Sequence, residues 1–314
     1  MNNWIINKIS KLFVAAYVLF GYAKYFFKNM RSIKLKNMSI GILLMVVAAS
    51  LFVSMKTSDV ALNGNSFLNE GYDHFNNDRF KEAHNSFQDA YDIFVEAKSE
   101  RGEFVSLRSL GDTDVSMKNN EEALKHFDNA LLIAQRLNYE QGQIDLLIKH
   151  AKLKIKLNRI DAARAHFYDA IKIAQDLKSS KNQSTLFTYV GNLERDYGND
   201  RRARSAYRNA LNTYIEENDL KGQANLHWNI GYMEKDLENY DAALASYILA
   251  RDLYKKSDSV INQANVVKFM ARLEKKLGTP EQATVYYNEA AILYASAGNT
   301  EELNSLRNEA GKIL

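Results

Sequence analysis

An alanine recurs every forty residues through most of the chain, and this spacing limits what the chain can fold into. Each of these alanines is followed at four residues by Phe or Tyr, at seven by a second alanine, and at eleven by an aromatic residue or alanine. Offsets of 0, 4, 7 and 11 lie on one face of an α-helix. A sustained period of this length predicts an array of helical repeats. The recurring alanines are Ala83, Ala123, Ala163, Ala203, Ala243 and Ala283.

A second helix is expected before each of these helices. A small residue lies twelve positions ahead of each alanine, and polar turn residues separate the two. We expect the small residue to let the paired helices approach closely, with the aromatic residue filling the space between neighbouring units. In the last unit Thr279 is a natural N-cap, and Pro280 would take the first helical position, where proline is tolerated. The small residues are Gly71, Gly111, Ala151, Gly191, Gly231 and Ala271.

Glycine or asparagine recurs between units with the same period. These residues tolerate a left-handed backbone conformation, so we expect them to end helices. After the sixth unit Glu302 takes their place, and residues 300–314 read as a closing amphipathic helix, which a stacked array needs at its end. The recurring residues are Gly102, Gly142, Asn182, Gly222 and Asn262.

These positions together resemble the tetratricopeptide repeat (TPR) family over roughly residues 60–298. The forty-residue period, longer than the usual length of about 34, is similar to that of peptide-responsive bacterial regulators, kinesin light chain and mitotic-spindle orientation adaptors. The resemblance implies an all-α fold, a TPR superhelical solenoid of six helix-turn-helix repeats plus a C-terminal capping helix, which here follows an N-terminal transmembrane helix. The expected solenoid spans 60–314, with repeats near 60–98, 99–138, 139–178, 179–218, 219–258 and 259–298 and the cap at 299–314.

The transmembrane helix is predicted from the composition of the first 58 residues, which contain no acidic residue. From Asp59 onward acidic residues number 38 and basic residues 33, so the high pI belongs to the N-terminal segment and does not indicate a nucleic-acid partner. Residues 38–55 form an uncharged apolar run. As a helix this run would be roughly 27 Å long, just sufficient for a hydrocarbon core of ~30 Å.

Residues 1–37 form a basic segment ahead of this run. Its apolar stretch, 12–23, is short for a span and is flanked by lysines, which fits an interfacial helix, with a two-helix hairpin as the alternative. The basic cluster at 28–36 should lie in the cytoplasm by the positive-inside rule. The predicted location is therefore the inner (plasma) membrane, single-pass, with the TPR domain on the periplasmic or extracytoplasmic side. A cleaved secretory signal read from Met30 is another alternative, and it would leave the repeats in the same compartment.

In the TPR family the first helix of each unit lines a concave face, along which peptides or helices of a partner lie. Carried over by position, the resemblance implies a groove with a positive lining, suited to an acidic segment or a carboxylate terminus. Asn192 and Asn229 match positions where family members hold a ligand backbone through asparagine amides. The alternative is that the lysines are a solvated face and the tryptophan packs between units. The candidate partner-binding residues are Trp228, Asn229, Tyr232, Asn192, Tyr189, Arg195, Lys149, Lys152, Lys156, Lys268 and Arg272.

The sequence contains no motif for catalysis, a metal or a cofactor. It has no cysteine, no His-Glu-x-x-His pair and no Gly-rich phosphate loop, and His126 and His166 occupy equivalent repeat positions. We expect neither a cofactor nor enzymatic activity. The predicted function is a membrane-anchored TPR scaffold or adaptor that binds a protein partner through its concave groove and helps to assemble or regulate a cell-envelope complex. A peptide-responsive regulatory receptor is the alternative, and an enzyme is less favoured.

Overall fold

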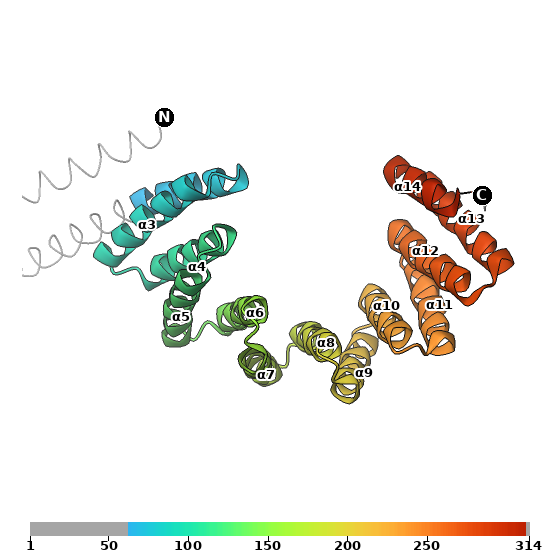
Figure 1. Ribbon diagram of the computed structural model, residues 1–314. Helices are drawn as coiled ribbons and strands as arrows, with labels where there is room; N and C mark the ends of the chain where they lie inside the picture. The colour runs from blue at the N-terminus through green and yellow to red at the C-terminus, as the bar shows by residue number, and fades with distance from the viewer. Residues whose placement is uncertain (1–61, 312–314) are drawn as a thin grey trace, which may run out of the picture. The chain divides into compact units, whose positions relative to one another are not determined.

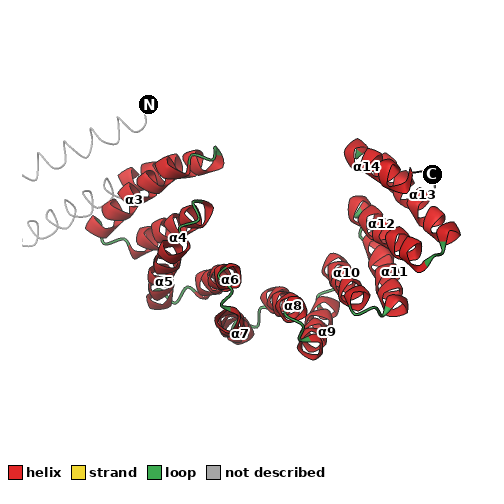
Figure 2. Cartoon of the chain, viewed as in Figure 1, coloured by secondary structure: helices red, strands yellow, loops and turns green. Residues whose placement is uncertain are grey.

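The computed structural model describes residues 62–311, and every regular element within this range is an α-helix (Figures 1 and 2). A helix over residues 62–76 comes first, and the helices α3 to α14 come after it. Their bounds are α3 Phe80–Glu96, α4 Glu100–Ser116, α5 Asn120–Arg136, α6 Glu140–Lys156, α7 Ile160–Asp176, α8 Ser180–Asp196, α9 Asp200–Glu216, α10 Leu220–Asp236, α11 Tyr240–Lys256, α12 Val260–Leu277, α13 Pro280–Ser296 and α14 Thr300–Ala310.

The helices are arranged as pairs, and each pair is one repeat. The first helices of repeats one to six are the helix over residues 62–76, α4, α6, α8, α10 and α12, and the second helices are α3, α5, α7, α9, α11 and α13. The chain divides into two compact units, one ending at Leu137 after repeat two and the other beginning at Asn138. The sequence pattern, which is uniform across this point, does not predict the division. Repeats three to six and α14 form the second unit.

The two helices of a repeat cross where the small residue of the first helix meets the aromatic residue of the second. A Cβ atom added to Gly111 would lie 2.3 Å from the ring of Phe127, and one added to Gly191 would lie 2.4 Å from the ring of Tyr207. Real Cβ atoms do not approach other atoms so closely, so only glycine fits at these crossings. The recurring alanines are completely buried. The predicted close approach of the paired helices is confirmed.

The predicted helix-ending role of the glycines and asparagines between units is wrong. Gly102 and Gly222 lie inside α4 and α10, where an added Cβ would lie 2.2 Å from Phe94 and 2.3 Å from Tyr214. They are close-packing positions like the glycines at the crossings. Gly142, Asn182 and Asn262 likewise lie inside helices. The left-handed residues that do end the helices recur every twenty residues and are Asp78, Lys98, Lys118, Asn138, Asn158, Lys178, Gly198, Asn218, Glu238, Asp258, Gly278 and Gly298.

The sequence predictions for the turn within repeat six and for the helix after this repeat are confirmed in part. Thr279 is the N-cap of α13 and Pro280 its first residue, although the Thr279 hydroxyl donates to the Glu274 carbonyl oxygen at 2.8 Å instead of capping α13. The predicted closing helix is α14. It buries Leu306 and Ala310 against repeat six. Its exposed residues are polar, which suits the end of a stacked array.

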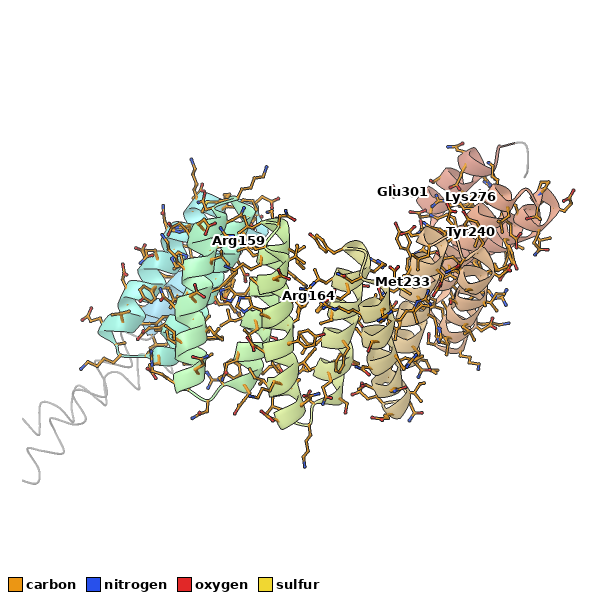
Figure 3. The ribbon with its side chains drawn as sticks, turned by 60° about the horizontal axis from the view of Figure 1, so that its bottom comes forward. Arg159, Arg164, Met233, Tyr240, Lys276 and Glu301 are labelled. Carbon is orange, nitrogen blue, oxygen red and sulfur yellow. The ribbon has the colours of Figure 1, made fainter. Side chains whose placement is uncertain are left out.

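A buried carboxylate stands near the end of several first helices, a pattern that was not predicted from the sequence. Glu194 and Glu234 are buried and accept hydrogen bonds from arginines of the preceding second helix: Arg164 at 3.2 Å and Arg204 at 3.0 Å, each from Nη2 to Oε2 (Figure 3 labels Arg164). A buried charge is stable only when it is paired and hydrogen-bonded. These pairs therefore fix how one repeat stacks on the next.

The segments assigned to the membrane lie outside the described residues. Both the basic segment 1–37 and the predicted span 38–55 precede residue 62. Among the helices between residues 62 and 311, none combines the length and the apolar composition that a membrane-spanning helix requires.

Candidate partner-binding site

The first helices of repeats four, five and six contribute five side chains to one pocket of about 250 Å³. Arg195 comes from α8, Phe269 comes from α12, and α10 contributes three residues in successive turns. We call this the aromatic pocket, and its lining residues are Arg195, Trp228, Asn229, Tyr232 and Phe269. Four of these five residues were predicted from the sequence, and the structure brings them together.

Three aromatic rings form the walls of the aromatic pocket. The ring centroids of Trp228 and Phe269 lie 5.6 Å apart with a tilt of 57°. Tyr232 is 37% exposed, and the Arg195 guanidinium carbon lies 5.2 Å from the centroid of its ring. Arg195 also donates to Asp196 at 2.7 Å. Aromatic rings next to a guanidinium group can contact an apolar side chain and an anionic group of the same ligand.

Asn192 and Tyr189, predicted for repeat four, have partners within the chain. The Tyr207 hydroxyl donates to Asn192 Oδ1 at 2.7 Å, and burial raises the pKa of Tyr207 to about 12, so this hydroxyl remains a donor at neutral pH. The Tyr189 ring stacks on Phe167 with centroids 5.7 Å apart. Both residues lie on α8 but do not line the aromatic pocket.

The predicted lysines of repeat three lie along α6, away from the lining of the aromatic pocket. Lys152 is exposed, and its ammonium group lies 4.6 Å from the centroid of the Tyr189 ring on α8. Lys149 is half-buried and Lys156 is exposed. These lysines extend the positive charge of the first-helix face into repeat three.

The predicted cations of repeat six are held by α14. Lys268 pairs with Glu302 at 2.8 Å, and Arg272 donates to both carboxylate oxygens of Glu309, at 2.7 and 2.6 Å. A bidentate pair of this kind fixes both side chains. Lys268 and Arg272 therefore hold the capping helix in place, and an external partner would have to compete with that helix for them.

The face made by the first helices of the second unit is basic. At the repeat positions of the pocket-lining residues, and at the position that follows Arg195, the helices α6, α8, α10 and α12 carry nine basic and two acidic residues. The acidic residues are Asp196 and Asp236. The basic residues are Lys149, Lys152, Lys156, Arg195, Lys235, Lys268, Arg272, Lys275 and Lys276. At the outer end of this face, Lys276 lies 4.8 Å from the Tyr240 ring centroid (Figure 3).

Sequence reasoning missed two residues at the aromatic pocket. Phe269 stands forty residues after Asn229 and was identifiable from the repeat register, although its side chain offers none of the polar groups that suggest a binding role. Lys235, forty after Arg195, places its ammonium group 4.1 Å from the Tyr232 centroid. The Tyr232 ring thus has two cations against it.

Histidines and carboxylates of the described residues do not gather into a metal-ligand set. Within residues 62–311 there is no cluster of three or more such side chains with suitable placement. His126 instead hydrogen-bonds to the buried Asp114, with 2.8 Å from Nδ1 to Oδ2, and His84 lies 3.6 Å from the other oxygen of that carboxylate. This cluster occupies the place that arginine–glutamate pairs take in later repeats.

The paired helices, which cross where a small residue meets an aromatic ring, are those of a TPR protein, and a tetratricopeptide repeat model matches residues 102–176. A second model, described as soluble NSF attachment protein, matches residues 145–307. That match spans more than half of the chain, and the chain therefore belongs to this family. No curated protein sequence matches the chain significantly.

Solved structures with similar folds are distant in sequence. Aspartyl phosphate phosphatase F from Bacillus subtilis has a TM-score of 0.59 at 12% identity, with 95% of this chain and 82% of that chain covered. BtubC (BKLC) from P. vanneervenii has a TM-score of 0.55 at 14% identity, covering 78% and 92%. A Rap protein complexed with competence and sporulation factor has a TM-score of 0.50 at 12% identity, covering 98% and 95%. At these identities the similarity shows the fold alone.

Proposed function

We propose that this protein is a membrane-anchored TPR scaffold or adaptor. Its first-helix face holds an acidic segment of a protein partner, and it helps to assemble or regulate a cell-envelope complex. The helix at 38–55 holds the chain in the inner (plasma) membrane, and the repeats lie on the extracytoplasmic side. In this role the protein takes no cofactor and catalyses no reaction. The forty-residue period further suggests membership of the TPR subclass that includes kinesin light chain.

The aromatic pocket is the observation that supports this function. Side chains from three consecutive repeats converge there, and Trp228 and Tyr232 are both partly exposed. Partly exposed tryptophan, tyrosine and arginine are the residues that dominate binding energy in protein interfaces. The surplus of positive charge around them favours an acidic partner.

A double substitution tests the pocket as a partner site. We expect Trp228→Ala with Asn229→Ala to abolish recovery of the partner from solubilised membranes, because the aromatic wall and the amide are both lost. Helical content should stay close to that of the parent chain because neither residue is fully buried, while the melting temperature should fall somewhat because Trp228 packs against the core of repeat five. Arg208→Ala, on the exposed face of α9, is the matched control and should recover the same proteins. If the double variant recovers the partner unchanged, the partner binds another surface of the protein.

The topology needs its own experiment. An alkaline phosphatase fused after Leu314 should be active, because the positive-inside rule leaves the repeats outside the cytoplasm. A fluorescent protein at the same position should remain dark if the fusion is exported by the general secretion route. An inactive phosphatase together with a fluorescent fusion would reverse the proposed orientation while leaving the partner site untouched.

A peptide-responsive regulator is the second candidate function. One similar structure is a Rap protein complexed with a competence and sporulation factor, and it covers nearly the whole of this chain. In that role, a short peptide in the aromatic pocket would change how tightly the second unit is wound. Small-angle scattering of the protein with and without a bound peptide separates the two functions, because a scaffold keeps its dimensions and a receptor becomes more compact.

A further inference from the structure

The hydroxyl of Tyr247 is an unexpected feature of the core of repeat five. Tyr247 is completely buried in α11, and its hydroxyl finds no hydrogen-bond partner among the described residues. Burial raises the pKa of Tyr247, so the group stays protonated and can donate. A buried hydroxyl without an acceptor is costly, and native structures rarely keep one without a reason.

The equivalent tyrosines of the neighbouring repeats do have acceptors. Tyr207, forty residues earlier, donates to Asn192 at 2.7 Å, and Tyr287, forty residues later, donates to Glu309 Oε1 at 3.0 Å. In both cases the acceptor comes from a first helix or from α14, which stacks as a further first helix. The hydroxyl at this repeat position therefore points to the first-helix face.

In repeat five the two acceptor positions are occupied by walls of the aromatic pocket. The residue equivalent to Asn192 is Tyr232, and the residue equivalent to Glu309 is Phe269. The Tyr247 ring lies 6.4 Å from that of Phe269 and belongs to the same packed cluster as Trp228. The unpaired hydroxyl thus lies beneath the pocket, where the chain itself supplies rings in place of an acceptor.

Cations stand at the pocket above this position, whereas the charge that acts on the Tyr247 hydroxyl itself is the Asp236 carboxylate, which adds to the rise of its pKa. Arg195 lines the pocket, and Lys235 lies against the Tyr232 ring. The carboxylates on this part of the first-helix face are Asp196, which pairs with Arg195 at 2.7 Å, and the exposed Asp236, which pairs with Lys235 at 2.9 Å. Neither carboxylate lines the pocket. Each carboxylate is thus offset by a cation of its own helix. Arg195 donates to Asp196 and, at 3.5 Å, to the Tyr207 hydroxyl, so a ligand carboxylate in the pocket would share Arg195 with these two groups.

In repeat six a carboxylate stands at the position that Phe269 takes in repeat five, and an arginine stands at the position that Tyr232 takes. There Glu309 accepts from the Tyr287 hydroxyl at 3.0 Å and from Arg272 at 2.7 and 2.6 Å. Resting on the function proposed above, we propose that the aromatic pocket binds a carboxylate of the partner peptide, which accepts from Arg195 and from the Tyr247 hydroxyl. Because Tyr247 is completely buried and does not itself line the pocket, the second contact requires the covering rings of Tyr232 and Phe269 to move aside. An apolar side chain next to that carboxylate contacts the rings of Trp228 and Phe269. The carboxylate comes from an acidic side chain or from a chain terminus.

The chain contains its own reporter for this experiment. It has two tryptophans, Trp4 and Trp228, so in a Trp4→Phe background the fluorescence reports the pocket alone. The probes are three short acetylated peptides, each with one leucine in the middle. In the first a glutamate comes directly after the leucine and the C-terminus is amidated, in the second glutamine replaces the glutamate, and in the third the only carboxylate is a free C-terminus.

We expect the fluorescence of Trp228 to change saturably with at least one of the two carboxylate peptides, and the peptide that binds identifies the source of the carboxylate. The amidated glutamine peptide should bind roughly tenfold more weakly or not at all, since a hydrogen bond to a charged group is worth more than one to a neutral group. Tyr247→Phe should weaken binding of the carboxylate peptide by a similar factor. Tyr287→Phe, at the equivalent position of repeat six, is the control and should leave binding unchanged.

The proposal fails if neither carboxylate peptide binds, if the glutamine peptide binds equally well, or if Tyr247→Phe binds as the parent chain does. These outcomes are separable from a failure of the proposed function. Suppose that the double variant Trp228→Ala with Asn229→Ala loses the native partner, whereas Tyr247→Phe binds the carboxylate peptide as the parent chain does. The pocket would then remain the partner site, and only the proposal that it binds a carboxylate through Tyr247 would be wrong. Retention of the partner by the double variant would overturn both.

Discussion

In repeat five the hydroxyl of Tyr247 has no partner within residues 62–311, whereas in repeat six the equivalent hydroxyl of Tyr287 donates to Glu309 of α14 at 3.0 Å. Both repeats are helix pairs with the tyrosine at the same position, and the difference lies in the helix that comes next on the first-helix face. Beside repeat six stands the capping helix with a carboxylate. Beside repeat five stands α12, which presents Phe269 at that place. The capping helix thus satisfies the donor of the last repeat, while an interior repeat keeps a donor for a ligand.

The largest effect is expected when the capping helix is loosened. Leu306 is completely buried against repeat six, and Leu306→Ala should cost roughly 2–5 kcal/mol through lost burial and the cavity left behind. Because repeats contact only their neighbours, the loss should be local. Hydrogen exchange should accelerate in α13 and α14 and stay unchanged in α10 and α11. Asn304→Ala, at an exposed position of the same helix, is the control. Equal acceleration in all four helices would show that the two repeats do not behave as separate parts.

Replacing each of the two tyrosines by phenylalanine should have an effect of intermediate size on stability, and the two substitutions should differ in direction. Tyr287→Phe removes a donor from a partly buried hydrogen bond and should destabilise repeat six by about 1 kcal/mol. Tyr247→Phe removes a hydroxyl that has no partner in the described residues and should leave repeat five equally stable or slightly more stable. Urea unfolding of the two variants, with the parent chain alongside, measures the difference. If Tyr247→Phe loses as much stability as Tyr287→Phe does, the Tyr247 hydroxyl has a hydrogen-bond partner, and repeats five and six do not differ in this respect.

The repeats were predictable because their determinants are local and recur. The recurring alanine of each second helix and the aromatic residue four positions later give a helix face by spacing alone, and the structure buries both. The role of Gly102 was misjudged because glycine permits both a left-handed turn and close packing, and sequence alone does not separate these uses. The turn falls instead at Lys98, a residue type with no marked preference for that conformation.

The pocket was predictable only in part, for a related reason. Trp228, Asn229 and Tyr232 were found because their positions resemble those of ligand-binding residues in the family. Lys268 and Arg272 pair with α14 because of how the last helix stacks on repeat six, and no local sequence pattern predicts that stacking. The unpaired hydroxyl of Tyr247 depends on three helices at once. A tyrosine at that repeat position was visible in the sequence, but the residues facing it were not.

The smallest effect is expected from acid, and it acts on repeat six alone. The hydrogen bonds from Arg272 hold the pKa of Glu309 below its usual range. A carboxylate with a lowered folded-state pKa stabilises the fold above its unfolded-state pKa of about 4.3. That contribution is lost as the pH falls through the lower, folded-state value. Because the pair is partly exposed and screened by solvent, we expect about 0.5–1 kcal/mol.

Other carboxylates titrate over the same range, so the informative quantity is the difference between variants. In Glu309→Gln the amide oxygen still accepts from Tyr287, but the charge that responds to pH is gone. Between pH 6 and pH 3 the parent chain should therefore lose more protection from hydrogen exchange in α14 than the variant does. In α11 the two proteins should behave alike, because the Tyr247 hydroxyl faces no carboxylate of the described chain that accepts from it. If α14 in both proteins responds equally to acid, Glu309 does not hold the cap through its charge, and it would then be a poor guide to how a ligand carboxylate meets Tyr247.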